Sequence, residues 1–83
     1  MKVYIAKTLV ETPDGNSCSV EMFKTRSSAN EWASNEIDTY AQDYDEPEIT
    51  KHEDFYRMFN NKWDIFGADT YVTIEIEEKE LDL

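Results

Sequence analysis

A turn between two alternating segments near the N-terminus restricts the fold more than any other feature of the chain. Pro13, Asp14 and Gly15 suit a tight turn, because proline presets φ, aspartate bonds to nearby backbone and glycine accepts positive φ. On either side, residues 2–10 and 17–24 alternate with the period of two that is typical of strands. The sequence therefore predicts an antiparallel hairpin.

A helix is predicted after this hairpin. Ser28 and Glu31 have the spacing of a capping box, in which each side chain bonds to the backbone N–H of the other residue. Apolar side chains then recur along one helical stripe. We expect an amphipathic helix over residues 28–44 that packs on the sheet through Trp32 and Ile37.

Two further elements follow. Thr50 and Glu53 have the spacing of a second capping box, and apolar residues at helical spacing predict a shorter helix over 51–61. Residues 70–78 alternate again and predict a strand, which we expect to pair with the first one. Its expected inward side chains are Val72, Ile74 and Ile76.

The predicted order is strand, strand, helix, helix, strand. It corresponds to an α+β fold, a three-stranded antiparallel sheet with one long amphipathic helix and one shorter helix packed on one face. A chain of 83 residues forms one domain, so residues 1–83 are treated as a single unit with a charged tail at 79–83 that frays.

Charge argues against several classes of partner. The net charge is −11, so direct binding to a nucleic-acid backbone or to anionic lipid is unfavourable. No apolar run approaches the roughly 20 residues of a membrane span, and the N-terminal stretch does not match a secretory signal. The single cysteine excludes an internal disulfide and a Cys-based zinc finger. A cytoplasmic protein is expected.

The acidic excess lies beyond the hairpin. Residues 1–26 are close to neutral, whereas residues 27–83 carry the whole excess. Glu31, Asp38 and Asp45 recur every seven residues and are expected to line one edge of the first helix. The other acidic candidates are a cluster around Pro47, which also includes Asp45, and a pair on the last strand, namely Asp43, Glu46, Glu48, Glu75 and Glu77.

Two interpretations of these acidic side chains stay open. Residues two apart on a strand, such as Glu75 and Glu77, lie roughly 6.6–6.8 Å from each other, close to the phosphate spacing of a nucleic-acid strand. The carboxylates could therefore occupy a groove built for phosphates. Alternatively, they only keep the protein soluble.

An aromatic segment over residues 55–66 is the other conspicuous feature. Most of its rings are needed to fill the core of so short a chain. A single short helix cannot turn all of them inward, however. Tyr56 and Trp63 are therefore predicted to be partly exposed, as anchors for a protein partner.

No catalytic residue, cofactor or dedicated metal site is predicted. His52 is the only histidine and has no nucleophile at a recognisable motif spacing. Cys18 lies within a predicted strand, where it would behave as a small apolar residue. The acidic run over 43–48 lacks the glycine and the length of a calcium loop.

The layout of the chain resembles small acidic proteins of bacteriophages, prophages and mobile elements. The resemblance rests on the segment Phe23–Trp32, in which a strand ends in an aromatic residue before a polar turn and a helix, and on the closing strand VTIEIEEKELDL. It implies an accessory role, because such proteins include anti-CRISPR and anti-restriction inhibitors, several of which imitate nucleic acid.

The leading hypothesis is a non-enzymatic binding protein. Its acidic residues would engage a basic protein surface, one that normally binds DNA or RNA, while Tyr56 and Trp63 would supply apolar contacts. The alternative is a structural or housekeeping module that self-associates through a sheet edge or the aromatic segment, so both a monomer and a homodimer are considered. A small hydrolase using His52 is the third hypothesis.

Overall fold

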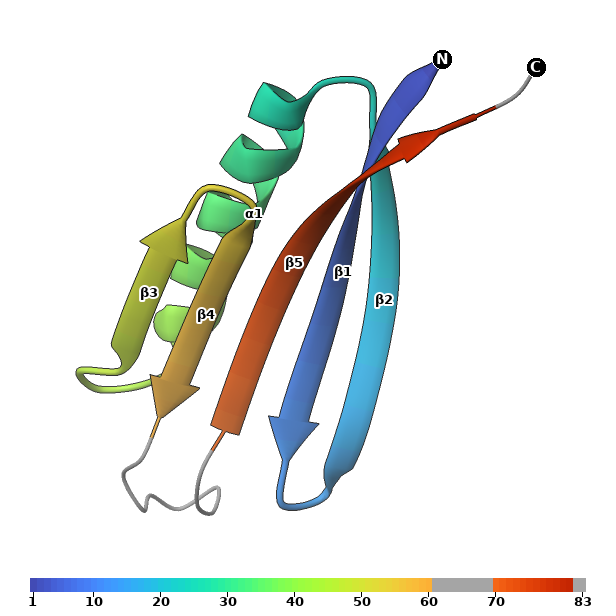
Figure 1. Ribbon diagram of the computed structural model, residues 1–83. Helices are drawn as coiled ribbons and strands as arrows, with labels where there is room; N and C mark the ends of the chain where they lie inside the picture. The colour runs from blue at the N-terminus through green and yellow to red at the C-terminus, as the bar shows by residue number, and fades with distance from the viewer. Residues whose placement is uncertain (61–69, 82–83) are drawn as a thin grey trace.

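The computed structural model describes residues 1–60 and 70–81. These residues form a five-stranded antiparallel sheet with one helix on one face (Figure 1). The strand order across the sheet is β2-β1-β5-β4-β3, so β2 and β3 are the two edges. The elements along the chain are β1 (Lys2–Thr12), β2 (Gly15–Phe23), α1 (Arg26–Ala41), β3 (Glu48–His52), β4 (Phe55–Asn60) and β5 (Thr70–Glu80).

The predicted three-stranded sheet with two helices is wrong. Over its described part, the helix predicted for 51–61 is instead the end of β3, a turn and β4. His52 lies opposite Phe55, which leaves Glu53 and Asp54 as a two-residue turn. Asp54 has a φ of 66°, a region that aspartate tolerates better than most residues. β4 has apolar side chains on both faces, and their spacing imitates that of a helix.

The N-terminal hairpin and the position of the last strand are confirmed. β1 and β2 pair antiparallel with Pro13 and Asp14 as the turn. Gly15 follows with a φ of 142°, which other residues rarely adopt. β5 pairs antiparallel with β1, as predicted, and the pairing continues to Glu80, two residues beyond the predicted end of the strand. Residues 82–83 lie outside the described part of the chain.

The helix begins and ends earlier than predicted. Its N-cap is Thr25, whose side-chain oxygen accepts a hydrogen bond of 3.1 Å from the backbone N–H of Ser28. Thr25, and not Ser28, is therefore the N-cap residue, and the predicted capping box of Ser28 and Glu31 is wrong. The helix ends at Ala41, before the predicted residue 44.

The core lies between α1 and the sheet. Small side chains, Ala29 and Ala33, let the helix approach the strands closely, and Ile37 fills the space beside them. Trp32 is half-buried against this core and packs beside Phe23, with ring centroids 5.5 Å apart. The strand residues buried in the same cluster are Ala6, Tyr56, Met58, Val72, Ile74 and Ile76, which confirms the predicted inward side of the last strand.

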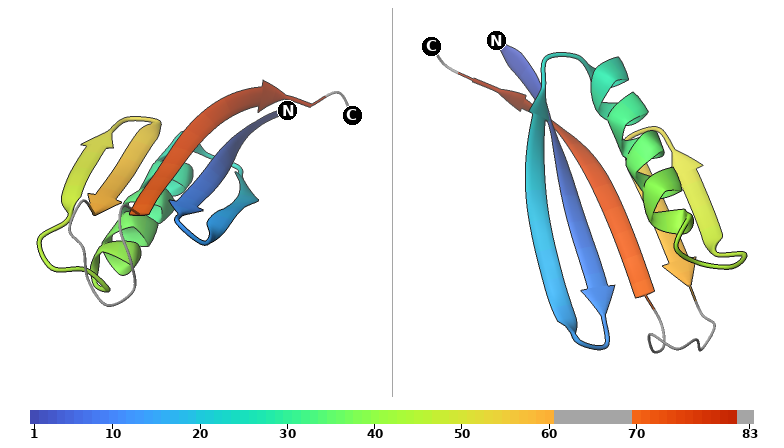
Figure 2. Two further views of the ribbon diagram at one scale, coloured as in Figure 1. Left: turned by 90° about the horizontal axis from the view of Figure 1, so that it is seen from below. Right: turned by 180° about the vertical axis from the view of Figure 1, so that it is seen from behind.

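Alternation along the strands separates a covered face from an open face. Tyr56 lies opposite Ile74 and Met58 opposite Val72, and all four are buried on the face that α1 covers. The residues between them project from the other side of the sheet. We call this other side the open face, because α1, the one helix of the described residues, lies on the opposite side (Figure 2).

Candidate protein-binding surfaces

The helix side of the molecule carries acidic side chains with no basic ones between them. Residues 27–50 include no lysine, arginine or histidine. The basic residues that flank this segment are each held by a carboxylate, Arg26 by Asp54 at 3.5 Å and Lys51 by Asp38 at 2.8 Å. We define the acidic helix side as the carboxylates of α1 and of the connection after it, namely Glu31, Glu36, Asp38, Asp43, Asp45 and Glu46.

The carboxylates are densest just after the C-terminal end of α1. The last turn has no basic residue, and Asp43 and Asp45, which follow it, are exposed to solvent. Negative charge at this end opposes the helix dipole and costs about 0.3–1 kcal/mol per exposed group. Glu46 adds a φ of 52°, which is uncommon outside glycine, directly before Pro47. This segment therefore concentrates negative potential at a cost in stability.

The predicted line of carboxylates along the helix is only partly present. Glu31 and Asp38 lie on α1 and are exposed, whereas Asp45 lies beyond the end of the helix. Asp38 accepts a hydrogen bond of 2.8 Å from Lys51 on β3, so its charge is partly compensated. The helix edge and the helix end thus form two parts of one acidic side.

The remaining acidic candidates lie on the open face. Glu75 and Glu77 alternate with buried Ile74 and Ile76 on β5, and Glu48 lies opposite Phe59 at the β3 edge of the same face. The predicted carboxylates are therefore divided between opposite sides of the sheet.

Glu75 and Glu77, whose predicted spacing is close to that of phosphates, have a lysine beside them. Lys7 lies opposite Glu75 in the register and forms an ion pair of 2.8 Å with Glu77. The hydrogen bond from Lys7, and its charge, lower the pKa of Glu77, and Glu77 in turn raises the pKa of Lys7. This pair is consequently a poor imitation of successive phosphates.

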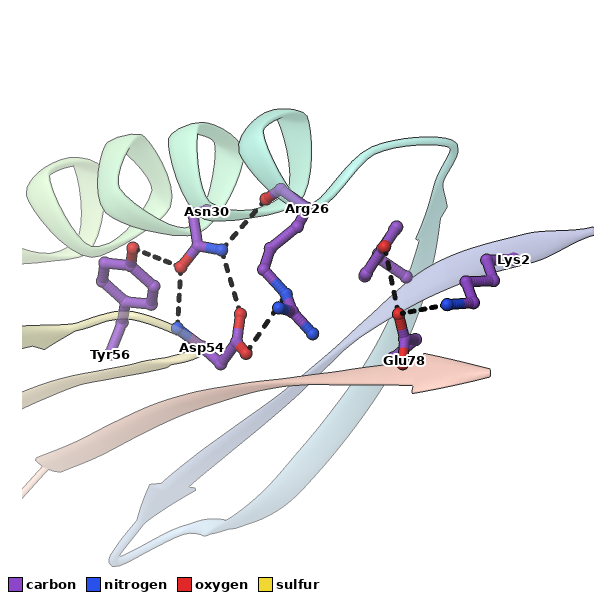
Figure 3. A network of polar contacts seen from close by, with 7 residues as sticks. Lys2, Arg26, Asn30, Asp54, Tyr56 and Glu78 are labelled. Atoms are coloured by element: carbon purple, nitrogen blue, oxygen red, sulfur yellow. Dashed lines mark hydrogen bonds and ion pairs between the residues drawn. The ribbon is translucent and has the colours of Figure 1, made fainter. Parts of the chain in front are cut away.

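Asn30 fastens the acidic helix to the β3–β4 turn (Figure 3). Its amide nitrogen donates to Asp54 Oδ1 at 3.0 Å and to the Arg26 carbonyl at 2.9 Å. Its Oδ1 accepts from the Asp54 backbone N–H at 2.8 Å and from the Tyr56 hydroxyl at 2.6 Å. These bonds use the full hydrogen-bonding capacity of the amide, so the network holds α1 at a fixed place on the sheet.

The predicted exposure of Tyr56 is wrong. This side chain is 7% exposed and faces the helix, because β4 turns alternate residues inward. Burial, and secondarily the nearby Asp54 carboxylate, raise the pKa of Tyr56. Tyr56 therefore anchors the core. Trp63, the other predicted anchor, lies outside the described residues.

A different pair of aromatic residues reaches the open face. Phe59 and Tyr71 are half-buried neighbours on β4 and β5, with stacked rings whose centroids lie 4.3 Å apart. The guanidinium of Arg57 lies 5.1 Å from the Tyr71 ring centroid and 5.8 Å from that of Phe59. The stacked rings and the cation–π contacts of the guanidinium stabilise these three side chains on the open face.

Apolar side chains near β2 form the least protected part of the open face. Val20 is 63% exposed, Met22 59% and Leu9 37%. Sequence reasoning missed this surface, although the alternation along β2 already placed Val20 and Met22 on one side. A shallow hollow of about 360 Å³ lies beside them, lined by Lys7, Thr8, Leu9, Glu11, Cys18, Thr73 and Glu75.

The two residues considered for chemistry are both exposed. Cys18 lies within a strand, as predicted, and belongs to the open face of β2. His52 ends β3 beside the turn. Within residues 1–60 and 70–81, no group of three or more histidine, cysteine, aspartate or glutamate residues is placed to hold a metal ion.

In the described part of the chain, no helix has the length and apolar character needed to cross a membrane. Comparison with protein-family models found no match, and no significant match was found among curated proteins or solved structures.

Proposed function

We propose that this chain is a non-enzymatic binding protein whose acidic helix side engages a basic protein surface of the kind that binds nucleic acid. The observation that carries the proposal is that residues 27–46 contain six carboxylates and no basic side chain, and that these carboxylates lie on α1 and just after its C-terminal end. A surface that attracts phosphates attracts carboxylates for the same reason, and arginine forks can bond both in a bidentate manner.

Local energetics support a role beyond solubility. Asp43 and Asp45 occupy the end of the helix where their charge is least favourable, although exposed carboxylates could keep the protein soluble from any other place. Natural sequences keep such locally unfavourable residues chiefly at functional sites. The Asn30 network supports the proposal further, because it fixes the helix and so holds the carboxylates in a defined arrangement.

The proposed contact is chiefly electrostatic, because Tyr56 is buried and supplies no anchor. Steering by opposite charges is screened beyond about 8 Å at physiological salt, so complexes should form readily at low salt and weaken steeply as salt rises.

Two triple variants test the proposal at identical net charge. One neutralises the helix side (Glu31→Gln, Asp43→Asn, Asp45→Asn), and the other neutralises carboxylates of the open face (Glu48→Gln, Glu75→Gln, Glu77→Gln). Immobilised wild-type chain should capture basic nucleic-acid-binding proteins from a lysate at about 50 mM NaCl, and added double-stranded DNA should release them.

The helix-side variant should lose this capture at least tenfold, while the open-face variant retains most of it. Equal loss in both variants would show that net charge alone drives the binding. Capture that resists double-stranded DNA would mean that the captured surface does not bind nucleic acid. Either result contradicts the proposal.

A further inference from the structure

The two edges of the sheet are built differently. The edge strand β3 is short and carries the charged residues Glu48 and Lys51, and charges on an edge strand discourage another strand from pairing. The edge strand β2 is longer, and Glu21 is its one charged residue. Within the described structure β2 pairs on one side, with β1, so the backbone groups on its outer side offer a template for another strand.

Side chains on β2 add an apolar surface to this template. Cys18, Val20 and Met22 project from the open face, next to Leu9 on β1. The opposite side of β2 is polar along most of its length, since α1 covers little of it. A strand added at this edge would therefore gain backbone hydrogen bonds and bury apolar area on one face.

We propose that two copies of this chain pair β2 with β2, antiparallel, around a twofold axis normal to the sheet. Such an axis maps each face of the sheet onto itself, so apolar residues of both copies meet on one continuous open face. With the axis near Ser19, Val20 lies opposite Cys18 of the second copy, and Glu21 lies opposite Ser17 of the second copy. No like charges then face each other across the junction.

The distribution of charge favours a second copy at this edge despite the net charge of −11. Residues 1–26, which include β2, are close to neutral. The acidic end of α1 connects to β3, at the opposite edge of the sheet (Figure 1). Four strand spacings amount to about 19 Å, which exceeds the Debye length of about 8 Å at physiological salt. Dimerisation should therefore strengthen with salt, opposite to the behaviour of the proposed basic partner, so each proposal can fail without the other.

Sedimentation equilibrium of the full chain at about 0.15 M NaCl tests the dimer. Val20→Lys places like charges beside the axis and should raise the dimer dissociation constant at least tenfold. Ile49→Lys is the matched control, because Ile49 is an exposed apolar residue on the other edge strand. It should leave the constant unchanged. Circular dichroism confirms that both variants are folded.

A distance measurement on the otherwise unmodified chain gives a second, independent readout. Nitroxide labels on Cys18, the single cysteine, should lie within about 20 Å of each other if β2 edges meet, but about 40 Å apart if β3 edges meet. The longer distance, a dimer insensitive to Val20→Lys, or a monomer at millimolar concentration would each overturn the proposal. A monomeric chain would mean that the β2 edge is available to a strand of another protein instead.

Discussion

At the scale of single residues, the neutral side chain of Asn30 holds the acidic elements in place. Exposed ion pairs such as Lys7–Glu77 contribute little to stability, because water and salt screen them. The bonds of Asn30 to Asp54 and Tyr56 are partly buried, and each contributes about 0.5–1.5 kcal/mol. The position of α1 therefore depends more on this amide than on the surface charges.

Tyr56→Phe tests this network, because its effect on the free energy of unfolding should depend on pH. The substitution removes the hydrogen bond to Asn30 and should lower the free energy of unfolding by about 0.5–1.5 kcal/mol at pH 8. Because the folded state raises the pKa of Tyr56, this stabilisation is complete below the unfolded pKa of about 10 and is lost as pH rises through the folded pKa. Urea unfolding at pH 8 and pH 11 measures the difference between the two proteins.

That difference should shrink at the higher pH. Tyr44→Phe is the control, since Tyr44 is half-buried against the core but lies outside the Asn30 network. Its effect should not change in the same way. If the stability difference between wild type and Tyr56→Phe is constant across this range, the hydroxyl is not the group that supplies the stabilisation.

Single positions show what local sequence can and cannot predict. The outward side of Glu75 and Glu77 follows from alternation and is confirmed. Their neighbour Lys7 could not be predicted, because the two strands are distant in sequence and the register between them is set by the tertiary fold. A list of acidic residues therefore did not reveal which carboxylates were already paired.

At the scale of elements, strong periodicity predicted the type of an element correctly, whereas the short apolar segment of β4 did not. The N-terminal hairpin, the long helix and the last strand were each predicted, with errors at the ends. β4 was predicted as helix, because Phe55, Met58 and Phe59 fit helical spacing as well as two faces of a strand. The polar pair Glu53 and Asp54 between two short alternating segments was the signal for a hairpin. The width of the open face was missed for the same reason, since β3 and β4 form two of its five strands.

The C-terminal end of α1 gives a prediction about a whole element. Asp43→Asn with Asp45→Asn removes negative charge next to the negative end of the helix dipole. The free energy of unfolding should rise by about 0.5–2 kcal/mol, measured by urea unfolding at low salt. Glu31→Gln, nearer the other end of the helix, should give no such gain. A loss of stability in the double variant would show that these carboxylates make contacts that outweigh the dipole.

At the scale of the whole molecule, shape and charge act together. The molecule extends 49 × 22 × 14 Å, so at an ionic strength of about 0.01 M, where the Debye length is about 30 Å, most of its charges repel one another across the fold. A net charge of −11 then destabilises the folded state. Thermal unfolding should show this repulsion directly, because added salt screens it.

The melting temperature should rise between about 0.01 M and 0.15 M NaCl by roughly 4–8 °C for each 1 kcal/mol of repulsion that is screened. The Val20→Lys variant, which we expect to be monomeric, is the protein to use, so that dimerisation does not contribute. Adding the helix-side triple substitution should reduce the rise more than adding the open-face triple, because Glu77 of the open-face triple is already paired with Lys7. A melting temperature that falls with salt would mean that ion pairs such as Lys51–Asp38 outweigh the repulsion, and the carboxylates would then exert too weak a field to attract a basic partner.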